Sequence, residues 1–168
     1  MQSESSRVTT AHEASFRVQY PNSRERAAKV IALDPEAARI LEPISRAHWH
    51  GAAFFTSLSF TAPTAPGQTL EAWLKDVAGH TMNLVAEVAA SDFVVVVASV
   101  GEDARAVSLI ADACKLHHKS LVALLVPQEG ETEEEIAASL KDLRPHARML
   151  VVASGPDYIE AMLTALRA

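Results

Sequence analysis

A short turn in the middle of the chain holds the side chains with the clearest chemical potential. It follows an apolar run and consists of Ser99, Val100, Gly101, Glu102 and Asp103. In a parallel sheet, a turn from strand to helix is where a ligand usually binds. A phosphate cradle needs bare backbone amides and therefore several glycines, whereas this turn has one glycine and two carboxylates. The two acids favour a different ligand: a small polar or cationic group, such as a cation, an amine or a basic side chain.

Further polar residues are expected at the same edge of the sheet. Asp34, Gln128 and Ser154 each follow an apolar run that predicts a strand, and the carboxyl ends of parallel strands meet at one edge. A ligand site is therefore expected at Asp34, Ser99, Val100, Gly101, Glu102, Asp103, Gln128 and Ser154. The alternative is that the three acids only cap helices, which stabilises a helix by about 0.3–1 kcal/mol each. The sequence leaves both interpretations open.

Ser99 also stands where a hydrolase would place its nucleophile. The elbow motif requires glycine two residues before and two residues after the serine. Here Val97 replaces the first glycine and Gly101 keeps the second. A serine nucleophile needs a neighbouring base, but the histidines with clear positions belong to the opposite edge, and the position of His80 is not fixed by the pattern. The sequence therefore argues against a hydrolase and leaves any catalytic residue unassigned.

Seven histidines raise the question of a metal site. His48 and His50 form one group, His117 and His118 form another, and both groups precede predicted strands. Those strands are expected three positions apart, on the order of 14 Å at about 4.8 Å per strand. The ligands of one zinc ion span only about 4 Å. We expect solvated loop histidines and no metal.

Length and composition indicate one folded domain of 168 residues. Hydrophobic residues make up 49% and charged residues 21%, which is typical of a soluble globular protein. The net charge of -6, with the basic residues scattered, argues against nucleic-acid binding. The apolar runs are too short to span a membrane. A single cysteine, Cys114, and an N-terminus without a signal-peptide pattern favour a cytoplasmic protein.

The hydrophobic pattern predicts an N-terminal arm over 1–25 and one Rossmann-like domain over 26–168. Apolar runs at 28–34, 51–60, 92–99, 120–127 and 148–154 predict strands, with amphipathic helices between them. Asp34 and Pro35 begin one helix, and Thr132 with Glu135 forms a capping box for another. The segment 69–88 is expected to form two short helices, because Leu70, Trp73, Leu74 and Val77, and then Leu84, Val85 and Val88, have helical spacing.

These elements predict an α/β fold: a single doubly wound three-layer α/β/α domain with a mostly parallel five-stranded sheet in the order 2-1-3-4-5. Over residues 68–166, their order resembles the core of the tubulin and bacterial cell-division (FtsZ-like) GTPase family. The resemblance is carried by "SDFVVVVASVGEDARAVSLIADACKLHHKSLVALLVPQEGE" and "ARMLVVAS". It implies a nucleotide fold in which GTP would lie at the turn that contains Gly101.

The chain departs from that family at the glycines. Gly101 alone stands where the family has its glycine-rich signature, and the first strand opens into "LDPEAARI", which has no glycine. We therefore expect a degenerate GTPase core with no cofactor, which binds neither GTP, ATP nor NAD.

The remaining pattern favours a non-catalytic module that works through self-association or protein interaction. The segment "GAAFFTSLSF" is uncharged and is expected at a sheet edge. An exposed edge of this kind tends to pair with another chain, which predicts a homodimer. The alternative is a small-molecule-binding domain or an enzyme that uses the carboxyl-terminal edge of the sheet.

Overall fold

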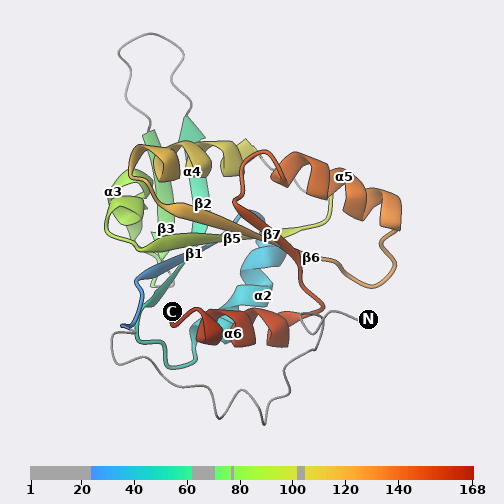
Figure 1. Ribbon diagram of the computed structural model, residues 1–168, viewed down its shortest axis with the longest axis horizontal. Coiled ribbons are helices and arrows are strands. Elements are labelled where there is room, and N and C mark those ends of the chain that lie inside the picture. Colours follow the sequence, from blue (N-terminus) through green and yellow to red (C-terminus); the bar gives the residue numbers. More distant parts are fainter. Residues whose placement is uncertain (1–23, 62–70, 77, 102–104) are drawn as a thin grey trace, which may run out of the picture.

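The computed structural model describes residues 24–61, 71–76, 78–101 and 105–168. Strands and helices alternate along most of this chain (Figure 1). The strands are β1 (Ala28–Ala32), β2 (Ala52–Thr61), β3 (Glu71–Asp76), β4 (Thr81–Asn83), β5 (Phe93–Ser99), β6 (Ser120–Val126) and β7 (Met149–Val152). The helices are α2 (Pro35–Ser45), α3 (Leu84–Ala89), α4 (Arg105–Leu116), α5 (Glu133–Leu143) and α6 (Pro156–Ala165).

The described strands form one mostly parallel sheet in the order β4-β3-β2-β1-β5-β6-β7. β1 pairs in parallel with β2 on one side and β5 on the other, and β6 and β7 continue the parallel ladder. β3 and β4 are antiparallel to their neighbours. The α/β class is therefore confirmed, but the sheet has seven strands rather than the five that were expected.

The two additional strands come from the segment in which we expected helices. Leu74 lies on β3 and is fully buried, and Asp76, Gly79 and His80 form a hairpin turn instead of a helix end. Gly79 has a φ of 90°, a left-handed conformation that glycine adopts easily. Apolar spacing alone did not decide this segment, because pairing with β2 satisfies its backbone and overrides helical propensity. The helix that does form, α3, begins later, with Asn83 as its N-cap.

The expected edge position of β2 is wrong. β3 pairs with β2 from Phe55↔Asp76 to Thr61↔Glu71, so β2 lies inside the sheet. The uncharged segment "GAAFFTSLSF" is covered by its own downstream hairpin. β2 therefore needs no second chain to cover its edge, and β4 and β7 are the strands at the two ends of the described sheet.

Helices cover both faces of the sheet, which gives three layers (Figure 1). α3, α4 and α5 contribute to the hydrophobic core on one face, and α2 and α6 contribute to the core on the other. All seven residues of β5 are buried, as expected for a central strand. Cys114 packs in the first core, and burial raises its pKa to about 11, so its thiol stays protonated at neutral pH.

The start of the described chain is attached at the amino-terminal edge of the sheet. The Asp92 carboxylate accepts the backbone N–H of Ala27 at 2.9 Å and an N–H of Arg24 at 2.6 Å. In return, the Asp92 N–H donates to the Ala27 carbonyl. The hydrogen bond from Ala27 and the charge of Arg24 hold the pKa of Asp92 below its usual value. This reciprocal contact fixes the entry to β1 next to β5.

Gly51, just before β2, lies against the segment that leads into β1 and leaves no room there for a side chain. A Cβ at Gly51 would lie 2.3 Å from the carbonyl oxygen of Arg26. We expect Gly51→Ala to lower the free energy of unfolding by roughly 1–3 kcal/mol, because the backbone would have to move. Gly155→Ala is the matched control, since a Cβ there meets nothing within 4 Å. Urea denaturation of both variants measures the difference, and equal stabilities would contradict the close approach.

Candidate functional site

The point at which β1 and β5 send their connections to opposite faces is occupied by a side-chain pair. Asp34 follows β1 and Ser99 ends β5, and both are buried. Asp34 Oδ1 accepts the N–H of Ala37 at 2.7 Å and also the hydroxyl of Ser99, while Oδ2 accepts the N–H of Ser99 at 2.8 Å. One carboxylate therefore caps α2 and holds the end of β5.

This geometry supports the capping interpretation of Asp34. Both carboxylate oxygens accept hydrogen bonds from the chain, so both are already satisfied without a ligand. Ser99 uses its hydroxyl as a donor to Asp34. His80 lies at the β3–β4 turn, where its ring nitrogen is 3.1 Å from Asp76, and β3 is three strands away from β5. Within the described residues, Ser99 thus has a carboxylate partner instead of a histidine base.

The other predicted site residues are spread along the carboxyl-terminal edge. Val100 is half-buried against the core, and Gln128 and Ser154 are exposed. Gln128 and Ser154 follow β6 and β7, two and three strands from β1, or on the order of 10–14 Å at about 4.8 Å per strand. The structure brings Asp34 and Ser99 together but leaves these two apart. Glu102 and Asp103 lie outside the described residues.

The single glycine of the turn is already engaged by a neighbouring helix. Gly101 has a φ of 80°, and its N–H donates to the hydroxyl of Ser139 on α5 at 3.0 Å. A backbone amide at this place is the group that a phosphate would use in a nucleotide fold. In this chain that amide connects the β5–α4 turn to α5.

The histidines of the two groups lie in different settings. His48 and His50 are exposed, with ring centroids 5.1 Å apart, and His118 is exposed at the end of α4. The Nε2 atom of His117 is buried without a hydrogen-bond partner in the structure. The described residues contain no group of three or more His, Cys, Asp or Glu side chains arranged to hold a metal ion.

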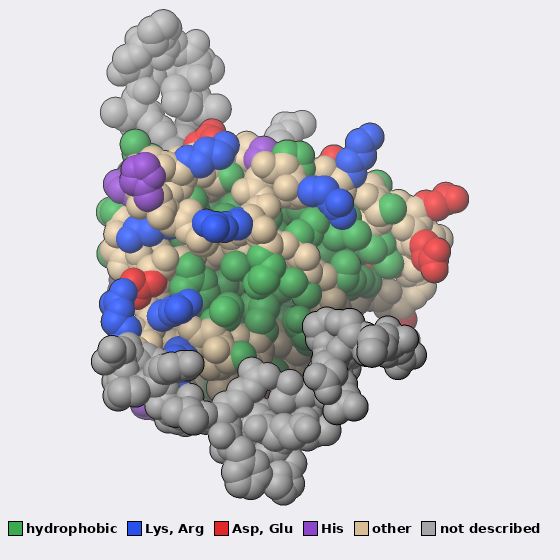
Figure 2. All heavy atoms as spheres, in the orientation of Figure 1, with side chains coloured by type: hydrophobic (Ala, Val, Ile, Leu, Met, Phe, Trp, Pro, Cys, Tyr) green, Lys and Arg blue, Asp and Glu red, His purple; other side chains and the backbone are tan. Residues whose placement is uncertain are grey.

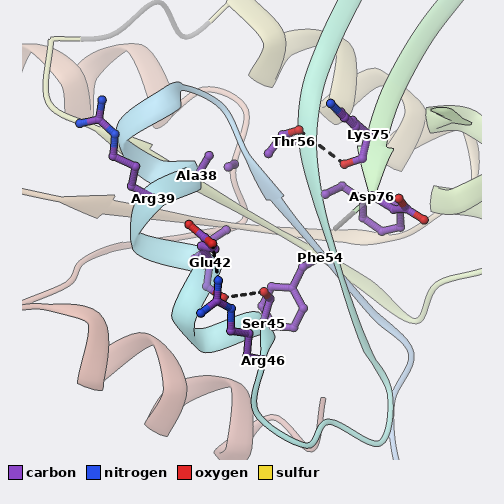
Figure 3. Close-up of a pocket in the computed structure, with 12 residues that line it drawn as sticks. Ala38, Arg39, Glu42, Ser45, Arg46, Phe54, Thr56, Lys75 and Asp76 are labelled. Carbon is purple, nitrogen blue, oxygen red and sulfur yellow. Dashed lines mark hydrogen bonds and ion pairs between the residues drawn. The ribbon is translucent and has the colours of Figure 1, made fainter. Parts of the chain in front are cut away.

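A groove of about 470 Å³ lies between α2 and the strands β2 and β3 (Figure 3). It exists because β2 leads into a hairpin, so no helix of the described chain packs beside α2 over these strands. Its lining comprises Ala32, Ala38, Arg39, Leu41, Glu42, Ser45, Arg46, Phe54, Phe55, Thr56, Lys75 and Asp76. The α2 residues form one wall, and Phe54 and Thr56 with Lys75 form the other.

Two ion pairs border this groove: Arg46 is 2.6 Å from Glu42, and Arg39 is 2.8 Å from Glu36. The hydrogen bonds from His80 lower the pKa of Asp76, so its carboxylate is ionised at neutral pH. Lys75 has no carboxylate partner among the described residues. The groove therefore combines an apolar floor with one unpaired ammonium group, a combination that an amphiphilic anion would fit.

The second surface feature is the outer edge of β7. Met149 and Val152 are 40% and 45% exposed, Leu150 and Val151 are half-buried, and none of the four carries a charge. Figure 2 shows hydrophobic side chains gathered on the face where β7 runs between α5 and α6. β4, at the other end of the sheet, is three residues long and includes the polar Thr81 and Asn83. Of the two edges, β7 is the apolar one.

The sequence reasoning missed both surfaces. The signal for the β7 edge was present, because "MLVV" is uncharged and belongs to the last strand of the predicted order. The groove had no sequence signal, since it depends on β3 being a strand. A scan against protein-family models and a search of curated proteins found no match to this chain. Among the described residues, no helix is long and apolar enough to cross a membrane.

The pair at the β1–β5 junction yields a stability prediction. We expect Ser99→Ala to lower the free energy of unfolding by about 1–3 kcal/mol, because a buried hydrogen bond to a carboxylate is lost. Asp34→Ala should cost more, since it removes the acceptor of three donors, including the cap of α2. Ser154→Ala, at an exposed serine of the same sheet edge, should change stability by less than about 0.5 kcal/mol. Chemical denaturation measures all three, and a Ser99→Ala variant as stable as the wild type would refute the structural role.

Proposed function

We propose that this chain is a non-catalytic association module whose working surface is the outer edge of β7. The observation that carries the proposal is β7 itself. It is an edge strand without charge, bulge or proline, and its Met149 and Val152 side chains are exposed. An edge of this kind adds a strand from another chain, because unpaired backbone groups supply affinity and alternate side chains supply specificity.

The ladder within β7 identifies the backbone groups that are available. Ala153 donates its N–H to the carbonyl of Leu125 on β6 at 2.8 Å, and Met149 to Val152 pair with Val122 to Leu125. Alternate residues of a parallel strand bond the same neighbour. Met149 and Val151 therefore direct their backbone groups towards β6, and Leu150 and Val152 direct theirs outwards.

The hydrogen bonding at the β1–β5 junction supports association over catalysis. In a doubly wound sheet, this junction is the usual ligand crevice, and here Asp34 and Ser99 are buried and hydrogen-bonded to each other. Descent from a tubulin-like nucleotide fold that has lost its glycine loops remains part of the proposal, as does the absence of a nucleotide cofactor. Neither is needed for the β7 edge to work.

A peptide probe tests this function directly. A fluorescent peptide that copies residues 147–154 is titrated with the protein at concentrations at which sedimentation shows the monomer. We expect a saturable rise in fluorescence anisotropy, because the peptide can pair with the outward groups of Leu150 and Val152. Val152→Pro removes one outward N–H and should abolish the rise.

Val152→Thr is the matched control for the peptide experiment. Threonine keeps the branched shape and the backbone N–H, so this variant should bind the peptide like the wild type. Absence of peptide binding by the wild type, or equal binding by the proline variant, would refute association at this edge.

A second candidate function, small-molecule binding, is supported by the groove beside α2. Its upper end at Ala32 and Thr56 lies towards the carboxyl ends of β1 and β2, and Lys75 supplies its free positive charge. We propose an amphiphilic anion as its ligand class, with the apolar body on Phe54 and the anionic group at Lys75.

The dye 1-anilinonaphthalene-8-sulfonate has this chemistry and serves as the probe. We expect an increase in its fluorescence with the native protein, and a weaker increase with Lys75→Glu because the sulfonate loses its counter-charge. Val152→Lys is the control that separates the groove from the apolar β7 edge. If Val152→Lys abolishes the signal and Lys75→Glu leaves it unchanged, the dye reports the edge and the groove proposal falls.

A further inference from the structure

We propose that the partner of the β7 edge is a second copy of this chain, joined by antiparallel β7–β7 pairing about a two-fold axis. The inference rests on the proposed function and names its partner. One continuous sheet would then run through both copies. Three features of the described residues support a second copy: the pairing pattern of the backbone, the uncharged side chains of β7, and the charges along α5.

The backbone groups of β7 define a single register for self-pairing. Leu150 and Val152 carry the outward N–H and C=O groups, and a hydrogen-bonded antiparallel pair exchanges both. Placing Leu150 of one copy opposite Val152 of the other satisfies all the outward groups of both strands. The axis then passes between the two Val151 residues, which face each other as a non-hydrogen-bonded pair.

The side chains of β7 are compatible with this register. Leu150 packs towards the α4–α5 face and Val151 towards the α2–α6 face. On each face, apolar residues therefore meet apolar residues from the other copy, and the exposed Met149 and Val152 become covered. Like charges directly opposite each other would oppose pairing, but the four residues of β7 carry no charge.

The orientation of α5 determines which of its flanks faces the second copy. The hydroxyl of Ser139 accepts the N–H of Gly101, so the Ser139 flank of α5 lies towards the β5–α4 turn. Glu133, Ala137, Lys141 and Arg144 follow one another at helical spacing on the opposite flank. That flank points beyond β7, and all four residues are exposed.

This flank of α5 is complementary to itself when two copies run antiparallel. Glu133 lies in the first turn and Lys141 in the last turn, so a two-fold axis brings the acid of one helix towards the base of the other. Ala137 lies midway between them, and its small side chain permits close approach of the two helices. Opposite charges that meet across an interface favour the correct orientation over others.

A cysteine cross-link tests the register. In a non-hydrogen-bonded antiparallel pair the Cα atoms are about 4.5 Å apart, within the range of about 4.4–6.8 Å that a disulfide spans. Val151→Cys should therefore form a covalent dimer under mild oxidation. Val152→Cys should not, although Val152 is the more exposed of the two, because its counterpart across the axis is Leu150. The buried Cys114, whose pKa is raised to about 11, should leave the wild type uncross-linked.

Charge exchange on α5 tests the orientation without touching β7. Sedimentation equilibrium should show that the wild type dimerises and that Glu133→Lys weakens dimerisation by roughly three- to tenfold, because each of the two symmetric ion pairs becomes a repulsion. Lys141→Glu should weaken it similarly. The double variant carrying both changes should recover most of the loss, which a merely structural role of either residue would not produce.

The outcomes separate the second-copy inference from the proposed function. If the β7 peptide binds while the whole chain stays monomeric and Val151→Cys does not cross-link, association at β7 stands and the second-copy inference is wrong. Preferential cross-linking of Val152→Cys would refute this register. A dimer that Val152→Pro leaves intact would place self-association elsewhere and refute the inference.

Discussion

Asp34 places one carboxylate between the start of α2 and the end of β5, where it accepts hydrogen bonds from Ala37 and from both donors of Ser99. Asp34 and Ser99 are 65 residues apart in sequence, and the helices that follow them, α2 and α4, cover opposite faces of the sheet. Burying a carboxylate costs free energy unless both its oxygens accept hydrogen bonds. Asp34 obtains these hydrogen bonds only when the start of α2 and the end of β5 lie next to each other. The pair lies at the junction where this architecture usually holds a ligand.

Two surface features of the described chain depend on which strands lie at the two sides of the sheet. β3 and β4 cover the flank of β2, and a salt bridge of 2.7 Å joins Lys29 on β1 to Glu87 on α3. Among the described residues, this hairpin adds no helix beside α2, and the groove lies there. On the opposite side, no described strand pairs with the outer edge of β7.

The proposed function rests on an asymmetry between the two edges of the sheet. The β4 edge is short and polar, whereas the β7 edge is apolar and lies beside a helix flank whose charges change sign from one end to the other. An uncharged edge strand can pair with an extended segment of any other chain. The charge order of α5 adds a preference for one orientation, and the combination favours a partner with the same strand beside the same helix.

The sequence by itself determined the elements whose signals are local. The cap formed by Asp34 and Pro35, the capping box of Thr132 and Glu135, the buried strand β5 and the packing of Cys114 all follow from residues close in the chain, and the structure confirms each of them. Such signals are readable because hydrogen bonds to nearby backbone groups and apolar periodicity act over a few residues.

The tertiary structure alone decided the segment from 71 to 83 and everything that depends on it. Leu74 fits a helical stripe and a strand equally well, and only the free flank of β2 selects the strand. That choice moved the sheet edge away from "GAAFFTSLSF" and opened the groove beside α2. The meeting of Asp34 with Ser99 was likewise beyond the sequence in detail, because the partners of a carboxylate depend on which strands become neighbours.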